Sequence, residues 1–122
     1  MQYYPKNYTL TREGDVDQSL FILLAGKIGI FKGDIKIAEF CNKGTIVGEM
    51  SIILKEARSA TIKTLEESHI AVIKADLKEL VEKHPEIAQK ILKNLAERLN
   101  KTTKDYWKLA EKINYLADVK FV

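Results

Sequence analysis

The hydrophobic pattern changes near residue 75, and this change limits the folds open to the chain. Before residue 75, short runs rich in β-branched and aromatic residues alternate with glycine-containing turns, whereas after it apolar residues recur at helical spacing. The runs that predict strands are Tyr8–Arg12, Leu20–Ala25, Lys27–Lys32, Ile35–Phe40, Ser59–Thr64 and His69–Lys74. Many short strands at close spacing favour an antiparallel sandwich, roll or barrel. We therefore expect one domain, with a β core in residues 1–75 and helices in residues 76–122.

Size and composition exclude several classes of protein. With 122 residues the chain is long enough for one domain and too short for two. Its net charge of +3 is too small to indicate a nucleic-acid partner. The apolar runs are too short to cross a bilayer and the start does not resemble a signal peptide, so a cytoplasmic protein is expected. Cys41, the single cysteine, excludes an intrachain disulfide and is expected to be a small buried side chain.

The second half predicts two helices, one short and one long. Asp76 is expected to cap the short helix, and Pro85 to open the long one, which extends to Asp118. The long helix carries an apolar seam at alternating steps of four and three residues: Ala88, Leu92, Leu95, Leu99, Thr102, Tyr106, Leu109, Ile113 and Leu116. Eight of these nine residues are apolar, and the seam lasts about four heptads, which is long enough for a coiled coil.

The seam predicts a parallel homodimer. The residues expected at the dimer interface are Leu92, Leu95, Leu99, Tyr106, Leu109 and Ile113. The alternative is a long helix that folds back on its own domain. Thr102 is the one polar residue of the seam, where a polar side chain can set the register of the two helices.

Residues 47–61 hold the side chains that could carry chemistry. The segment Glu49–Leu54 interrupts the β pattern and predicts a single helical turn, preceded by Gly48 and followed by Arg58 nine positions after Glu49. A phosphate is favoured by free N–H groups at a helix N-terminus and by a guanidinium that can bind two oxygens. Glu49 could accept a hydrogen bond from a ribose hydroxyl, and Ser59 supplies a side-chain hydroxyl beside the phosphate or the base.

These residues together match the needs of a cyclic nucleotide, which has one phosphate charge, one ribose hydroxyl and a flat base. Glu49 and Arg58 are expected to stabilise one another when no ligand is bound. The alternative is that they form only a surface ion pair, worth at most about 1 kcal/mol.

Residues 47–61 resemble the phosphate-binding cassette of the cyclic-nucleotide-binding domain family, whose pattern is Gly-Glu, a small-apolar stretch, then Arg-Ser/Thr-Ala. Ala57 stands where many members have proline. The resemblance continues over nearly the whole chain, in Tyr4–Lys6, Arg12–Asp15, Leu20–Ile28 and Asn42–Gly44. It implies an antiparallel β-roll, or jelly roll, followed by a long C-terminal dimerisation helix. It also implies a ligand site formed by Gly48, Glu49, Met50, Ser51, Arg58 and Ser59.

The long helix is similar to that of one branch, the CRP/FNR regulators. Residues 96–103 resemble their dimer helix, which implies that Thr102 and Thr103 contact the base, and residues 112–121 resemble their hinge. The resemblance implies a homodimeric cAMP sensor, with cGMP as the alternative ligand and no cofactor. DNA would be bound only through a helix-turn-helix domain, and none of the 122 residues resembles one.

Two other functions compete with this hypothesis. A metal enzyme of similar β architecture would need clustered ligands, but the only histidines are His69, at the start of an edge-like strand, and His84, before a helix. No nucleophile and base are paired either, so we expect neither a metal site nor catalysis. The second alternative is an orphan domain that serves only in assembly or senses another molecule. Such domains often lack the cassette arginine, which is present here as Arg58.

Overall fold

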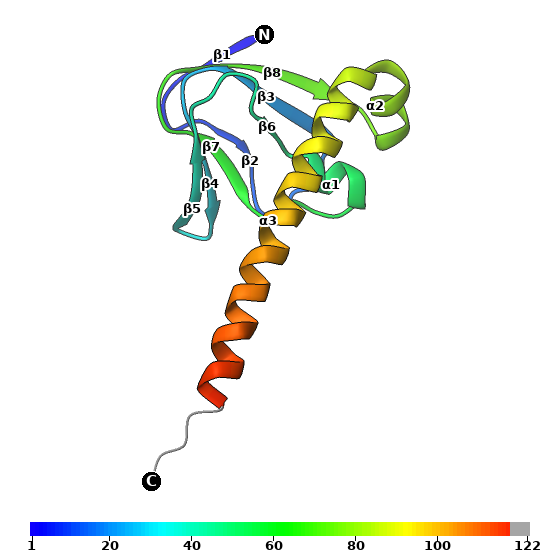
Figure 1. Ribbon diagram of the computed structural model, residues 1–122. Helices are drawn as coiled ribbons and strands as arrows, with labels where there is room; N and C mark the ends of the chain where they lie inside the picture. The colour runs from blue at the N-terminus through cyan, green and yellow to red at the C-terminus, as the bar shows by residue number, and fades with distance from the viewer. Residues whose placement is uncertain (118–122) are drawn as a thin grey trace. The chain divides into compact units, whose positions relative to one another are not determined.

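The first 84 residues form two antiparallel sheets that face one another as a roll (Figure 1). The computed structural model describes residues 1–117. One sheet has the strand order β1-β8-β3-β6 and the other has the order β2-β7-β4-β5. The strands are β1 (Gln2–Tyr4), β2 (Thr9–Thr11), β3 (Ser19–Ala25), β4 (Ile28–Lys32), β5 (Ile35–Phe40), β6 (Ile46–Val47), β7 (Thr61–Thr64) and β8 (Ser68–Lys74).

The core lies between the two sheets. It consists of the buried side chains Phe21, Leu23, Ile28, Val47, Ile62 and Ile70, with Tyr4, Leu10, Ile30 and Val72 packed against them. These residues alternate along β3, β4 and β8 because successive side chains of a strand point to opposite faces. The alternation of apolar residues along these strands therefore directs their side chains into the space between the two sheets.

The six predicted strands are present, with ends that differ by up to two residues. The turn Gly33-Asp34 joins β4 to β5 as expected, since Lys32 lies opposite Ile35. β7 begins at Thr61, so Ser59 precedes the strand that was expected to include it. The sequence did not predict β1 or β6. Both are short and lie at the edge of a sheet, where they pair with β8 and β3.

Two expectations about single residues are wrong. Cys41 is exposed, because it follows directly after β5, a strand at the edge of its sheet. His69 lies in β8, which is not an edge strand because β1 pairs with its outer side. The His69 side chain is nevertheless exposed.

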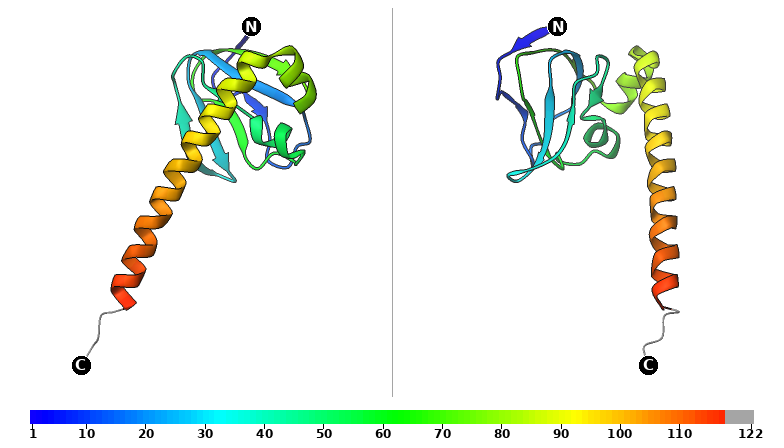
Figure 2. Two further views of the ribbon diagram at one scale, coloured as in Figure 1. Left: turned by 45° about the vertical axis from the view of Figure 1, so that its right-hand side comes forward. Right: turned by 60° about the vertical axis from the view of Figure 1, so that its left-hand side comes forward.

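The three helices of residues 1–117 are α1 (Glu49–Leu54), α2 (Leu77–Lys83) and α3 (Pro85–Ala117). Asp76 caps α2 as predicted, since its carboxylate accepts a hydrogen bond of 2.8 Å from the backbone N–H of Glu79. By internal contacts the chain forms two compact units, Met1–His84 and the part from Pro85 onward, so α2 belongs with the roll. Figure 2 shows α3 as one unbroken helix, and Asp118, its predicted end, lies outside the described residues.

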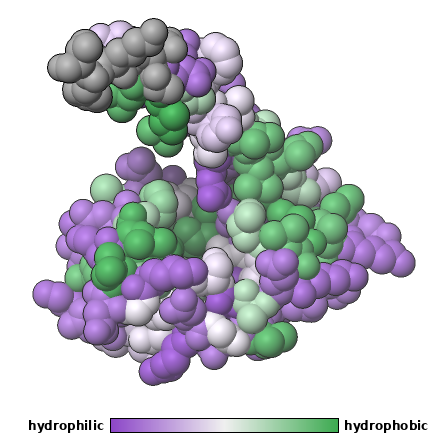
Figure 3. All heavy atoms as spheres, turned by 90° about the horizontal axis from the view of Figure 1, so that it is seen from below, coloured by the Kyte–Doolittle hydropathy of each residue, from purple (hydrophilic) through white to green (hydrophobic). Residues whose placement is uncertain are grey.

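No helix within residues 1–117 is both long enough and apolar enough to span a membrane. On the face drawn in Figure 3, polar residues surround several separate apolar patches. Some large apolar side chains of the roll are exposed, among them Ile35 and Ile37 of the edge strand β5.

Candidate functional site

The cassette, residues 47–61, folds as the end of β6, the helix α1, a loop and the start of β7. Gly48 precedes α1 with a φ of +90°, a left-handed conformation that glycine adopts without steric cost. A Cβ atom at Gly48 would lie 2.8 Å from Nη1 of Arg58 and 3.1 Å from the carbonyl oxygen of Ser19. The glycine therefore allows the guanidinium of Arg58 to lie directly against the backbone at the start of α1.

The backbone of Arg58 is fixed to the loop between β2 and β3. Its N–H donates to the carbonyl oxygen of Asp15 at 2.8 Å, and its own carbonyl oxygen accepts from the N–H of Gly14 at 2.8 Å. These two bonds join the cassette to the turn Arg12–Asp15, which the sequence analysis singled out on resemblance alone. They place the side chain of Arg58 beside the residues that follow this turn.

The guanidinium of Arg58 is buried and fully hydrogen-bonded. Nε donates to Oδ2 of Asp17 at 3.2 Å, and Nη2 donates to Oδ1 of Asp17 and to the carbonyl oxygen of Ser19. Nη1 donates to the carbonyl oxygen of Gly48 at 2.8 Å and to Oγ of Ser51 at 2.5 Å. An arginine has five N–H groups, so these five bonds use all of them. The residue is 4% exposed, and its guanidinium carbon lies 5.6 Å from the centre of the Phe21 ring.

Asp17 is the carboxylate that pairs with Arg58. Besides its two bonds from Arg58, it accepts hydrogen bonds from Oγ1 of Thr11 at 2.7 Å and from the backbone N–H of Ser19 at 3.0 Å. Partial burial raises the pKa of Asp17, but the hydrogen bonds from Arg58, Thr11 and Ser19 and the positive charge of Arg58 outweigh it. The pKa falls to about 2. Asp17 is therefore ionised at neutral pH and balances the buried positive charge.

The other predicted ligand residues occupy different environments. Glu49, in the first turn of α1, is 7% exposed, and Ser51 is half-buried. The alternative of a surface ion pair between Glu49 and Arg58 is wrong, because both residues are buried. Their direct interaction stays a prediction, since the hydrogen bonds described for Arg58 go elsewhere. Met50 and Ser59 are exposed.

The structure thus brings Gly48, Ser51 and Arg58 into mutual contact, with Glu49 directly after Gly48. Thr102 and Thr103 are exposed residues of α3, in the second compact unit. Their expected contact with a base stays a prediction.

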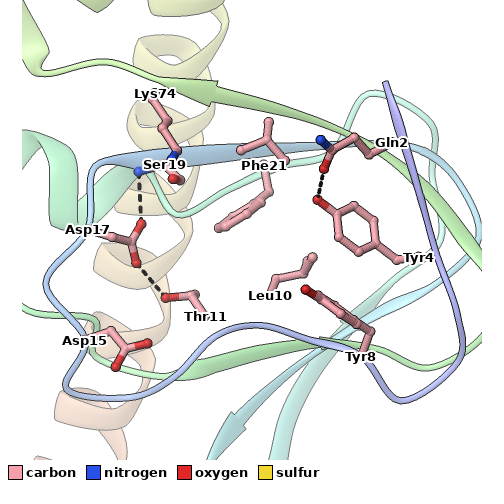
Figure 4. A pocket seen from close by; sticks show the side chains of 11 residues that line it. Gln2, Tyr4, Tyr8, Leu10, Thr11, Asp15, Asp17, Ser19, Phe21 and Lys74 are labelled. Carbon is pink, nitrogen blue, oxygen red and sulfur yellow. Dashed lines mark hydrogen bonds between the residues drawn. The ribbon is translucent and has the colours of Figure 1, made fainter.

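Asp17 and Ser19 also line a cavity of about 650 Å³ that enters the roll (Figure 4). The remaining lining residues are Gln2, Tyr4, Tyr8, Leu10, Thr11, Asp15, Phe21, Val72 and Lys74. In Figure 4, Asp17 and Thr11 lie at one end, Tyr4 and Gln2 at the other, and Phe21 and Leu10 between them. The cavity gives solvent access to the carboxylate of Asp17, the partner of Arg58. The side chain of Asp17 is 33% exposed.

Sequence reasoning missed Asp17, Thr11 and Ser19. Asp17 lies 41 residues before Arg58, and its local sequence indicates only a polar loop before a strand. The available signal was the resemblance of Arg12–Asp15 to a family turn, which marks the loop but not the carboxylate two residues beyond it. Within residues 1–117 no group of three or more His, Cys, Asp or Glu side chains is arranged to hold a metal ion.

The two-sheet roll with a buried arginine beside a short helix is the architecture of a ligand-binding domain. The chain belongs to the cyclic nucleotide-binding domain family, whose profile matches residues 1–84. It is 28% identical over 101 residues to the cyclic AMP receptor protein of Thermus thermophilus, an alignment that covers 79% of this chain and 47% of that protein.

Solved structures agree with the fold. The catabolite activator protein of Thermus thermophilus superposes with a TM-score of 0.75 at 24% identity, over 89% of this chain and 54% of that one. A cyclic nucleotide-binding domain from Methylobacillus flagellatus superposes with a TM-score of 0.66 at 30% identity, over 90% of this chain and 65% of that one. The chain spans about half the length of most of the curated relatives that it matches.

Proposed function

We propose that this chain is the sensor domain of a CRP/FNR-type regulator and binds one cAMP per subunit at the cassette, with cGMP as the alternative ligand. The observation that carries the proposal is the buried guanidinium of Arg58, held against the start of α1 by Gly48 and Ser51. A buried cation beside free N–H groups of a helix start suits a phosphate that carries one negative charge.

Each cassette residue has a role in this proposal. The guanidinium of Arg58 and the backbone N–H groups of Met50 and Ser51 bind the phosphate oxygens, because these N–H groups lie in the first turn of α1 and have no partner within the helix. Glu49 accepts a hydrogen bond from the ribose 2′-hydroxyl. The exposed hydroxyl of Ser59, next to Arg58, donates to the phosphate or the base.

The base is contacted by Thr102 and Thr103 of α3, and α3 pairs with its copy in a homodimer. The resemblance to the CRP/FNR helix supports both roles. Five of the six predicted interface residues of α3 are exposed, by 70% for Leu92, 68% for Leu99, 71% for Tyr106, 56% for Leu109 and 57% for Ile113, whereas Leu95 is half-buried. Exposed leucine and isoleucine at heptad spacing are the pattern that a second helix covers in a coiled coil.

In this proposal, ligand binding at the cassette changes the arrangement of α3. A ligand that binds one arrangement of α3 more tightly than another shifts the equilibrium between them, by no more than its difference in affinity. The name of the Thermus thermophilus relative, a cyclic AMP receptor protein, supports cAMP as the ligand. In a regulator of this type the helix would transmit the change to a DNA-binding domain.

Titration calorimetry with cAMP, cGMP and 5′-AMP tests the proposal. We expect the purified chain to bind cAMP more tightly than 5′-AMP, and Arg58→Leu to lose most of the affinity because the phosphate charge keeps only backbone donors. Arg12→Leu is the matched control, since it removes an exposed arginine beside the same loop and should leave the affinity unchanged. Equal affinity of the Arg58→Leu chain and the unmodified chain would reject the site.

A further inference from the structure

The guanidinium of Arg58 has no N–H group left for a ligand. Asp17 takes two of its five hydrogen bonds, and the carbonyl oxygens of Ser19 and Gly48 and the hydroxyl of Ser51 take one each. Within residues 1–117 no buried side-chain nitrogen or oxygen lacks a partner. A phosphate oxygen can therefore reach this guanidinium only by replacing an acceptor that is already bound.

The acceptors differ in how readily they can leave. Asp17 carries a full negative charge and is held by Thr11 and Ser19, so its loss would leave a buried cation unpaired. The carbonyl oxygens of Ser19 and Gly48 belong to the backbone of β3 and of the α1 cap, and they cannot turn away without breaking those elements. The hydroxyl of Ser51 is neutral and leaves by rotation about one side-chain bond.

Ser51 also loses little when its hydroxyl moves. In the ligand-free chain the hydroxyl donates to the carbonyl oxygen of Gly48 at 3.2 Å, and because the residue is only half-buried the hydroxyl can bond to water after it has rotated away. An anionic phosphate oxygen is a stronger acceptor than a hydroxyl, since a bond from Arg58 to phosphate carries a charge at both ends and the bond to Ser51 only at the donor. The exchange of Ser51 for phosphate is therefore favourable at Nη1.

We infer that Ser51 is an affinity-setting residue: its hydroxyl occupies, in the ligand-free chain, the Nη1 position of Arg58 that a cyclic phosphate takes on binding. The inference rests on the proposed function, because it describes how the same site exchanges its own acceptor for the ligand. Ser51 accepts a hydrogen bond from Arg58 in the ligand-free chain. The ligand has to replace this bond, and Ser51 thereby lowers the affinity for the cyclic nucleotide.

Replacement of Ser51 separates this role from that of an ordinary ligand contact. Ser51→Ala leaves one N–H of Arg58 unsatisfied only in the ligand-free chain, so cAMP should bind about fivefold more tightly, the factor that corresponds to one net hydrogen bond. Ser51→Thr keeps the hydroxyl and should not show this gain in affinity. In a chain that already carries Arg58→Leu, Ser51→Ala should have no effect.

Calorimetry of these four variants with cAMP, together with NMR of the Arg58 side chain, tests the inference. Unchanged or weaker binding by Ser51→Ala, while the unmodified chain binds, would overturn it and leave the proposed function intact. If the unmodified chain binds no cyclic nucleotide, the proposed function fails and the affinity-setting role of Ser51 fails with it. In the ligand-free chain, Ser51→Ala should speed the rotation of the Nη1 group, and identical Arg58 signals in the two chains would overturn the inference.

Discussion

Asp17 holds Arg58 with both carboxylate oxygens, Oδ2 accepting from Nε at 3.2 Å and Oδ1 accepting from Nη2. The two residues are 41 positions apart, and their ion pair joins the loop after β2 to the cassette. The side chain of Arg58 is 3% exposed and that of Asp17 is 33% exposed. The cation is thus buried in the roll, while its counter-ion keeps some contact with solvent. Asp17 is therefore the partner that can be replaced with less disturbance of the packing.

Asp17→Asn should destabilise the chain and weaken nucleotide binding. It leaves a buried guanidinium without its counter-ion, which costs about 3–5 kcal/mol in fully buried pairs. The partial exposure of Asp17 reduces the expected loss to about 2 kcal/mol. Urea unfolding measures it. Asp15→Asn is the control, because this exposed carboxylate accepts only a backbone N–H from Arg12 in the described residues, and its change should stay within about 0.5 kcal/mol. Equal stabilities of the two variants would contradict the role of Asp17.

Acid should remove the contribution of the same carboxylate. The pKa of Asp17 is about 2 in the folded chain, below its ordinary value of 3.8, so the folded state binds the proton less readily than the unfolded state. The pair therefore stabilises the fold fully above about pH 4, and this contribution is lost as the pH falls toward 2. Thermal melts between pH 2 and 6 should show the unmodified chain and Asp17→Asn converging at the acid end. A constant difference across that range would contradict the assignment.

Gly48→Ala should lower the affinity for cAMP through a steric contact with Arg58, in addition to the strain of its left-handed backbone. A Cβ atom there would lie 2.8 Å from Nη1 of Arg58, so we expect cAMP affinity to fall at least about tenfold, as one misplaced phosphate contact implies. Gly33→Ala is the matched control, because Gly33 lies in the β4–β5 turn with a φ of +58°, and apart from its chain neighbours no described atom lies within 4 Å of its added Cβ. Both variants should lose about 1–2 kcal/mol of stability from the left-handed backbone. Similar affinity losses in both would indicate a general folding defect instead.

Leu99→Glu or Leu109→Glu should convert the proposed dimer to a monomer, because each places a charge in the apolar seam of α3. Sedimentation velocity of the purified chain measures the change. Asn100→Glu adds the same charge on the same helix outside the seam and should leave the dimer intact. Unchanged sedimentation of Leu99→Glu would refute the coiled-coil interface.

The short-range patterns of the sequence were sufficient for most of the architecture. The six predicted strands, the turn Gly33-Asp34, the cap Asp76 and the opening Pro85 are each encoded by neighbours within a few residues, and the structure contains all of them. The short helix α1 was predictable for the same reason, because Gly48 and Glu49–Leu54 break the β alternation locally. Resemblance then singled out Arg58, a residue whose burial no local pattern indicates.

Only the tertiary structure decided what surrounds Arg58. The strands β1 and β6 exist because β8 and β3 offer them hydrogen-bonding edges, and the segments around these two strands do not show enough alternation to predict a strand. Asp17 and Ser51 are ordinary polar residues in the sequence. They become the acceptors of a buried cation because the roll closes the loop after β2 onto the cassette, and contacts between distant segments depend on the whole fold rather than on local spacing.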